Sequence, residues 1–200
     1  MPRTSPETTA SKKSVQSRLT SAFQQLMSLH WVMSWCYFTL FATGYVMTHW
    51  IPGDTDFQSS AYDFHKGLGA LMLALLTWRV FLLLRVWWKK YSHHLPKFSL
   101  PWWRKASLHA LLYVFMWAVP LTGFFLSNSY QSNNVKFMGI ILPDLFPQNS
   151  TVLGLARSMH FWFAYAFLAF VLLHMVEQRK VVRSIWRRWT QAFKQRHSNT

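Results

Sequence analysis

Residues 157–179 read RSMHFWFAYAFLAFVLLHMVEQR, an apolar stretch long enough to cross a bilayer as a single helix. The stretch carries one histidine near each end, His160 and His174, fourteen residues apart. Fourteen residues make nearly four helical turns, so both imidazoles lie on one face, about 21 Å apart along the axis. We therefore expect this helix to present a histidine near each surface of a membrane.

Three further apolar runs of similar length precede this stretch. The four runs cover about residues 29–50, 62–84, 106–127 and 157–176. Each run is nearly continuously apolar and lacks the alternation of a strand, so each is predicted to be a helix. An even number of spans joined by short connections predicts an all-α, up-down, four-helix transmembrane bundle with the lipid bilayer as its surroundings.

The distribution of basic residues predicts how the bundle is oriented. The chain carries 21 Lys and Arg against 6 Asp and Glu, for a formal net charge of +15. The basic residues avoid the apolar runs and gather in the N-terminal tail, the second connection and the C-terminal tail. Because positive charge stays on the cytoplasmic side of a membrane, both termini are predicted to be cytoplasmic. The charge pattern thus indicates a membrane partner and no nucleic acid.

The composition divides the chain into three parts. Residues 1–25 are rich in polar residues and predict a tail without stable structure, although an organelle targeting segment has a similar composition. Residues 26–180 form the membrane domain. Residues 181–200 carry tryptophans and basic residues at helical spacing and predict an amphipathic segment on the inner membrane surface. The single cysteine, Cys36, excludes an intramolecular disulfide.

The fourteen-residue spacing recurs in each of the other runs. The recurrences are His30 to Gly44, His65 to Arg79, and His109 to Gly123. In an up-down bundle these residues stack in two layers, because neighbouring helices run in opposite directions. The cytoplasmic layer then holds His30 and His174, with His109 in addition, and the periplasmic layer holds His65 and His160.

Two imidazoles that face each other across a bundle suit the axial positions of a six-coordinate haem iron. Zinc would usually require four ligands with carboxylate or thiolate among them, and neither layer offers these in number. The layers therefore predict two haems, one at each level, held by histidines from different helices. Each histidine taken alone could instead be an interfacial polar residue, which is how we interpret His49 at the end of the first run.

The other residues in the layers are consistent with haem and also have simpler explanations. Gly44 and Gly123 would let a porphyrin approach the backbone closely, or they would serve helix packing. Arg79 would pair with a haem propionate, or its side chain would extend to the cytoplasmic surface.

Four motifs along residues 26–180 carry a resemblance to a known family. They are L-H-W at 29–31, D-F-H-K-G at 63–67, S-L-H-A-L-L-Y to P-L-T-G at 107–123, and M-H to L-H at 159–174. On these motifs the chain resembles the bacterial cytochrome b561 family, which implies a four-helix bundle with two b-type haems. By position, the resemblance implies that His30 and His174 hold the inner haem and that His65 and His160 hold the outer haem, in agreement with the two layers. The resemblance also implies a quinone site near the inner haem, with His109 as a candidate lining residue. Some relatives have a further histidine two turns after the last ligand, where this chain reads Lys180–Val182.

The expected function is transmembrane electron transfer to or from quinone, in a protein of the bacterial inner membrane. The resemblance implies superoxide:quinone oxidoreduction, in which Lys66, Lys136 and Arg157 would attract the anion at the outer surface. One alternative is the quinone-linked haem b anchor subunit of a hydrogenase or formate dehydrogenase, which needs a redox partner protein. Another alternative is a haem-free scaffold or transporter.

Overall fold

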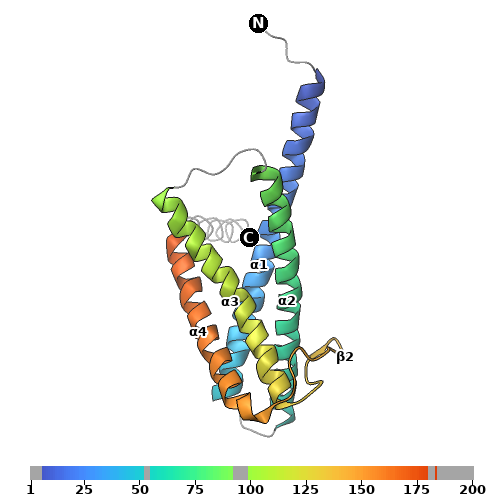
Figure 1. The fold of residues 1–200 in the computed structure, drawn as a ribbon, viewed down its shortest axis with the longest axis vertical. Coiled ribbons are helices and arrows are strands. Elements are labelled where there is room, and N and C mark those ends of the chain that lie inside the picture. Colours follow the sequence, from blue (N-terminus) through green and yellow to red (C-terminus); the bar gives the residue numbers. More distant parts are fainter. Residues whose placement is uncertain (1–5, 52–54, 92–98, 180–182, 184–200) are drawn as a thin grey trace, which may run out of the picture.

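The computed structural model describes residues 6–51, 55–91, 99–179 and 183. Four long helices run alternately in opposite directions and pack side by side (Figure 1). Helix α1 packs mainly on α2, α4 packs mainly on α3, and α2 joins the two pairs through α3. The helices are α1 (Pro6–His49), α2 (Asp56–Tyr91), α3 (Leu100–Tyr130) and α4 (Leu153–Glu177).

Three of these helices are long and apolar enough to cross a membrane. The candidate spans are Asp56–Trp88, Trp102–Tyr130 and Ser150–Glu177, which correspond to α2, α3 and α4. The structure therefore confirms a mostly helical chain with three candidate membrane-spanning helices, and α1 completes the group of four as a less apolar helix. Each of the four helices contains most of one apolar run of the sequence.

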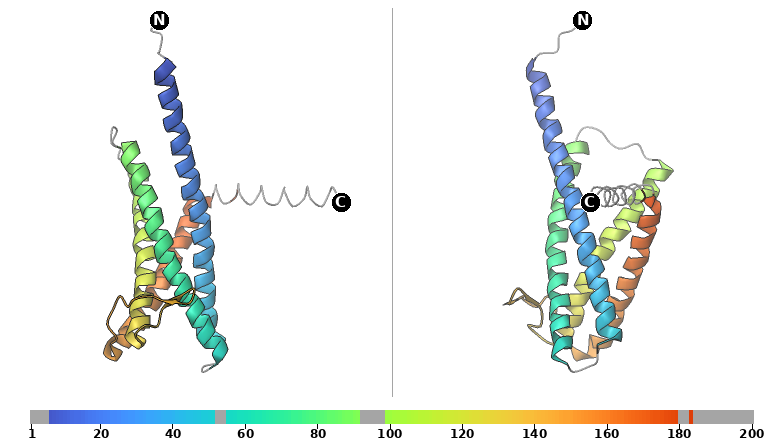
Figure 2. Two further views of the ribbon diagram at one scale, coloured as in Figure 1. Left: turned by 90° about the vertical axis from the view of Figure 1, so that its right-hand side faces the viewer. Right: turned by 180° about the vertical axis from the view of Figure 1, so that it is seen from behind.

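Helix α1 is longer than the apolar run that it contains. It begins at Pro6 and projects past the ends of the other helices (Figure 2). Residues 6–25 continue the helix of the bundle, whereas the division of the chain at residue 25 stays a prediction. Extending an existing helix adds one hydrogen bond per residue and avoids the unfavourable nucleation step. The predicted amphipathic segment at 181–200 lies, apart from Arg183, outside the described residues.

The core of the bundle occupies the middle level of the four helices. On each helix, one residue lies midway between the two residues of the fourteen-residue spacing, seven positions from each. These four residues are Tyr37, Met72, Met116 and Phe167. Tyr37, Met72 and Phe167 are only 8%, 0% and 2% exposed. The rings of Tyr37 and Phe167 meet edge to face at 4.9 Å between centroids. A packed apolar partition therefore separates the two levels at which the histidines lie.

A proline in α3 explains one polar contact inside this partition. Pro120 lies within the helix and has no N–H to donate to the carbonyl four residues earlier, which belongs to Met116. The hydroxyl of Tyr37 on α1 donates to that carbonyl oxygen at 3.0 Å. The hydrogen bond between helices replaces the one that the proline removes, as buried backbone acceptors require.

A folded connection between α3 and α4 covers one end of α2. Its short hairpin pairs β1 (Lys136–Phe137) with β2 (Ile140–Ile141) and is followed by a 3₁₀ turn, η1 (Ser150–Val152). The hairpin turn has positive φ at Met138 and Gly139, the combination that a tight two-residue turn requires. A Cβ at Gly67 of α2 would lie 2.9 Å from the Lys136 carbonyl oxygen, so only glycine permits this close contact.

Candidate functional site

The special residues of the four helices occupy two levels on either side of the apolar partition. We call the first level the hairpin-side layer, because it lies toward the β1–β2 connection, and it comprises Gly44, His65, Gly123 and His160. We call the other the tail-side layer, because α1 enters and α4 leaves at that end, and it comprises His30, Arg79, His109 and His174. Each helix contributes one residue to each layer.

In the hairpin-side layer the two histidines point toward each other between the helix pairs. His65 on α2 and His160 on α4 have ring centroids 6.3 Å apart, with the rings perpendicular. Both side chains are partly buried. The structure therefore brings together the two residues that the sequence placed in the periplasmic layer.

The two glycines of this layer lie directly behind the two imidazole rings. A Cβ built on Gly44 would lie 3.3 Å from Cε1 of His65, and one built on Gly123 would lie 3.2 Å from Cε1 of His160. These distances are shorter than ordinary van der Waals contact, so a side chain at either position would displace the ring. The glycines therefore keep space for the two imidazole rings.

Two threonines that the sequence reasoning missed complete the hairpin-side layer. The Oγ1 atom of Thr43 lies 3.0 Å from Nδ1 of His65, and the Oγ1 atom of Thr122 lies 3.3 Å from Nδ1 of His160. Each threonine directly precedes a layer glycine, so the dipeptide Thr-Gly occurs twice, 79 residues apart. This repeated dipeptide is the sequence signal that could have identified them.

In the tail-side layer the closest pair of imidazoles is His109 on α3 and His174 on α4. Their ring centroids lie 5.1 Å apart at an interplanar angle of 89°. Nδ1 of His109 donates to the Lys105 carbonyl oxygen of its own helix at 2.7 Å, because a carbonyl can only accept. Nδ1 of His174 is buried and has no hydrogen-bond partner among the described residues. This layer is thus less completely hydrogen-bonded than the hairpin-side layer.

His30 and Arg79 supply the other two groups of the tail-side layer. His30 interacts electrostatically with Arg79, His109 and His174, although its ring contact is with Trp31, 5.8 Å away between centroids. Nε of Arg79 donates to the Tyr113 hydroxyl at 3.0 Å, and Nη1 donates to the Leu26 carbonyl oxygen at 3.5 Å. The guanidinium is therefore held within the bundle by two neighbouring helices, α3 and α1.

The basic residues expected at the outer surface share one carboxylate. Nζ of Lys66 lies 2.8 Å from Asp63, and Nζ of Lys136 lies 3.7 Å from the same carboxylate. Lys66 also donates to the side-chain oxygen of Asn134 at 2.8 Å. The three charges sum to a single positive charge, so the cluster attracts anions only weakly. Arg157 is exposed on α4.

His49 stands apart from both layers. It is exposed at the end of α1 and stacks on Tyr45, with ring centroids 4.3 Å apart. Its Nδ1 donates to the Tyr45 carbonyl oxygen at 3.0 Å. This local arrangement agrees with an interfacial residue. His93, His94 and His197 lie outside the described residues.

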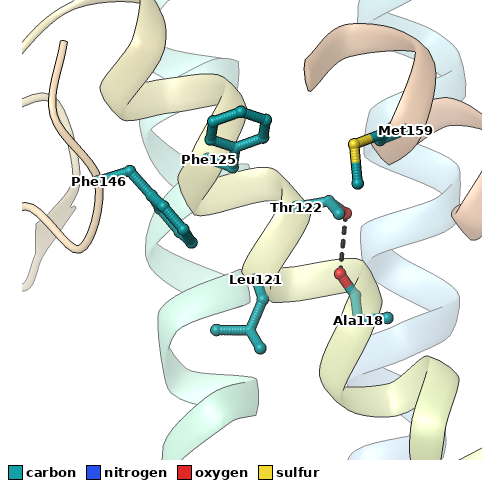
Figure 3. A pocket seen from close by; sticks show the side chains of 6 residues that line it. All are labelled: Ala118, Leu121, Thr122, Phe125, Phe146 and Met159. Carbon is teal, nitrogen blue, oxygen red and sulfur yellow. Dashed lines mark hydrogen bonds between the residues drawn. The ribbon is translucent and has the colours of Figure 1, made fainter. Parts of the chain in front are cut away.

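An apolar notch of about 270 Å³ lies between α3, α4 and their connection, beside the hairpin-side layer (Figure 3). The lining residues are Ala118, Leu121, Thr122, Phe125, Phe146 and Met159. Its one polar side chain, Thr122, donates its hydroxyl proton to the Ala118 carbonyl oxygen at 2.8 Å. Among its lining side chains the notch therefore offers no free hydrogen-bond donor to a quinone carbonyl.

The fold and the layers define a class, namely helical membrane proteins that hold histidine pairs between helices at two depths. The chain matches the family model of prokaryotic cytochrome b561 over residues 24–180. Because this match covers most of the chain, the chain belongs to the prokaryotic cytochrome b561 family. Among curated proteins, the search found no match. Family membership implies an integral membrane protein that binds b-type haem and transfers electrons across the membrane.

The residues of the hairpin-side layer suit a haem. Haem iron takes neutral imidazole nitrogens at its axial positions, and two imidazoles from opposite helix pairs converge here. Among the described residues no hydrogen bond reaches Nε2 of His65 or of His160, which leaves these nitrogens available. In the part of the chain that the structure describes, no cluster of three or more His, Cys, Asp or Glu could bind a metal without such a cofactor.

Proposed function

We propose that this protein carries electrons across the membrane between two b-type haems, one at each layer. His65 and His160 would hold the haem on the hairpin side, and His30 and His174 would hold the haem on the tail side. The convergence of His65 and His160 in front of two glycines is the observation that carries the proposal. When bound, b-type haem supplies the one-electron redox chemistry, and the chain supplies ligands, burial and spacing.

The membrane domain in this proposal comprises residues 26–180, and all four helices span the bilayer. The tail side is cytoplasmic, because the N-terminal tail, the second connection and the C-terminal tail carry most of the Lys and Arg. The hairpin side then faces the periplasm of a bacterial inner membrane. This orientation places the Lys66 and Lys136 cluster at the periplasmic surface.

Quinone reacts at the tail side, where His109 is the residue best placed to bind it. Its side chain is exposed, and its Nδ1–H is donated within α3, so Nε2 carries a lone pair that accepts a hydrogen bond from a quinol hydroxyl. Its ring also lies against His174, a ligand in this proposal. His109 therefore connects the quinone with the tail-side layer.

Superoxide is the donor that the family resemblance favours. Two superoxide anions lose one electron each to give two molecules of O₂, and one quinone takes up both electrons and two protons to become quinol. The net positive charge at Lys66, Lys136 and Asp63 favours approach of the anion from the hairpin side. In the alternative function, the chain is the anchor subunit of a larger enzyme, and a redox partner protein supplies the electrons in place of superoxide.

The purified full-length chain tests the proposal in two steps. A reduced-minus-oxidised spectrum with haem quantified per chain should show two b-type haems, and a colourless preparation made with adequate haem supply would overturn the proposal. Superoxide-dependent quinone reduction should then occur with the isolated chain. Haem without this activity, together with co-purification of a redox subunit, would favour the anchor-subunit function. His109→Ala should impair quinone reduction while both haems are retained. His49→Ala, at an exposed histidine outside both layers, should leave quinone reduction unimpaired.

A further inference from the structure

The threonines of the hairpin-side layer form matching contacts in two helix pairs. In the pair α1 and α2, Thr43 contacts Nδ1 of His65, and in the pair α3 and α4, Thr122 contacts Nδ1 of His160. Each threonine precedes the glycine that lies behind the same ring. The same contact thus occurs on both sides of the layer, although nothing in the proposed function requires a threonine.

The direction of these hydrogen bonds follows from the neighbouring carbonyl groups. The Thr43 hydroxyl donates its only proton to the Thr39 carbonyl oxygen at 2.8 Å and to the Leu40 carbonyl oxygen at 3.1 Å. The Thr43 oxygen can therefore only accept from Nδ1 of His65. Nδ1 of His65 must then carry the proton, which leaves the lone pair of this neutral imidazole on Nε2.

His160 has the same tautomer for a second and independent reason. Its Nδ1 lies 3.1 Å from the Val119 carbonyl oxygen, which can only accept. The Thr122 hydroxyl donates to the Ala118 and Val119 carbonyl oxygens at 2.8 and 2.9 Å, so it too can only accept from the ring. Both rings therefore present an unprotonated Nε2.

We propose that Thr43 and Thr122 are positioning residues that fix His65 and His160 in the Nδ1-protonated tautomer and tune the potential of the hairpin-side haem. This inference rests on the proposed function, in which these two histidines are the ligands. A ligand imidazole that donates Nδ1–H to an acceptor is more basic and better oriented. A more basic ligand stabilises the oxidised iron, so the threonines lower the midpoint potential.

The two threonines are not equally important. Thr43 is the only hydrogen-bond acceptor that the described residues offer to Nδ1 of His65. Nδ1 of His160 has the Val119 carbonyl as well as Thr122. Removing the Thr43 hydroxyl leaves a donor without a partner, whereas removing the Thr122 hydroxyl does not. The structure therefore ranks Thr43 above Thr122 in its effect on the potential.

Potentiometric titration of the full-length protein with both haems resolved tests this ranking. Thr43→Val keeps the shape of the side chain and removes the acceptor. At a fixed potential, its hairpin-side haem should show a ratio of reduced to oxidised iron about fivefold higher, the effect of one ordinary hydrogen bond, or a rise of about 40 mV. Thr122→Val should give a smaller rise, and the tail-side haem should be unaffected in both.

Two control variants separate the hydroxyl from packing. Thr43→Ser retains the hydroxyl and should keep the wild-type potential. Thr39→Val removes a hydroxyl one turn earlier on α1 that donates only to the Trp35 carbonyl oxygen, and it should change nothing. If Thr43→Val loses the haem altogether, two measurements still test the inference. The potential of the hairpin-side haem should rise slightly in Thr122→Val and stay at the wild-type value in Thr43→Ser.

The outcomes distinguish this inference from the proposed function. Two haems per chain in Thr43→Val with an unchanged potential would overturn the inference alone. A potential in Thr43→Ser that follows Thr43→Val would also overturn it, because the methyl group would then be responsible. A wild-type chain without haem would overturn the proposed function and this inference together.

Discussion

The hairpin-side and tail-side layers are built from the same four helices and yet differ in kind. The hairpin-side layer repeats one arrangement twice, with a glycine behind each imidazole and a threonine at each Nδ1. The tail-side layer has no glycine and holds three histidines and an arginine, and the buried Nδ1 of His174 has no partner among the described residues. One end of the bundle is symmetric and preorganised, whereas the other is polar and asymmetric.

This difference indicates different tasks for the two ends. A layer in which every Nδ1 is hydrogen-bonded holds its imidazoles in a fixed tautomer and orientation. A layer with an exposed imidazole at His109 and a guanidinium at Arg79 can exchange hydrogen bonds and protons with a bound molecule. The difference supports the proposed function, in which electrons enter at the hairpin side and quinone reacts at the tail side.

The largest expected effect comes from removing a ligand. His65→Ala and His160→Ala should each lose the same haem, on the hairpin side, and retain the other, because an iron with one axial imidazole is poorly held. His30→Ala and His174→Ala should each lose the tail-side haem. Difference spectra with haem quantified per chain measure both. Survival of two haems in His174→Ala would contradict the pairing.

His109→Ala is the matched control for the tail-side assignment. Among the described residues, the imidazole whose ring contacts His174 is that of His109, 5.1 Å away between centroids. If His30 is the ligand, His109→Ala keeps both haems, and His30→Ala keeps one. One haem in His109→Ala and two haems in His30→Ala would instead make His109 the ligand. That result would exclude His109 as the quinone-binding residue.

The next largest effect is steric and belongs to the hairpin-side layer alone. Gly44→Ala and Gly123→Ala should weaken haem retention there by about tenfold, because the new methyl group displaces the imidazole, and such overpacking typically destabilises by about 1–3 kcal/mol. Gly69→Ala on α2 is the control, since a Cβ at that position meets nothing within 4 Å. The measurement is haem loss during detergent washing, followed by absorbance. Equal retention in all three variants would mean that the glycines serve helix packing only.

A smaller effect is electrostatic and belongs to the tail-side layer. Arg79→Met removes a positive charge near His30, and it should lower the potential of the tail-side haem by roughly 60 mV, equivalent to about 1.4 kcal/mol at an effective dielectric constant near 20. Arg79→Lys keeps the charge and should restore most of the potential. Redox titration checks both variants, and an equal shift of both haems would show that the two layers are not electrically distinct.

The smallest expected effect concerns the partition between the layers. Tyr37→Phe should lower the free energy of unfolding by about 1 kcal/mol, because the Met116 carbonyl loses the donor that replaces the missing N–H of Pro120. In a Pro120→Ala background, the helix supplies its own donor and Tyr37→Phe should have much less effect. Thermal unfolding of the wild type, the two single variants and the double variant gives the coupling free energy between Tyr37 and Pro120. Additive effects of the two substitutions would contradict this explanation.

The sequence predicted the features that depend on helical spacing alone. The apolar runs located the four helices, and the fourteen-residue interval grouped the special residues into two levels, including the convergence of His65 and His160. Spacing on one helix cannot show which neighbour a side chain meets, so the contacts of Thr43 and Thr122 emerged only from the fold. The same limit applies to His174, which contacts His109 in the structure, whereas the sequence paired it with His30.

Features that depend on the local backbone were also outside the reach of the sequence patterns. The helix at residues 6–25 continues from an apolar run into polar sequence, where amphipathic spacing gives no signal. The β1–β2 hairpin rests on a turn at Met138 and Gly139 and on close contact with Gly67, and neither strand is long enough to show alternation. The first feature depends on the extension of an existing helix and the second on tertiary contacts, and neither depends on periodicity.

Haem stoichiometry in the single variants of the hairpin-side layer is the most direct measurement. We expect two b-type haems per wild-type chain, and one and the same remaining haem, with identical spectrum and potential, in His65→Ala and His160→Ala. Loss of different haems in these two variants, or two haems in either, would show that these histidines do not share one iron.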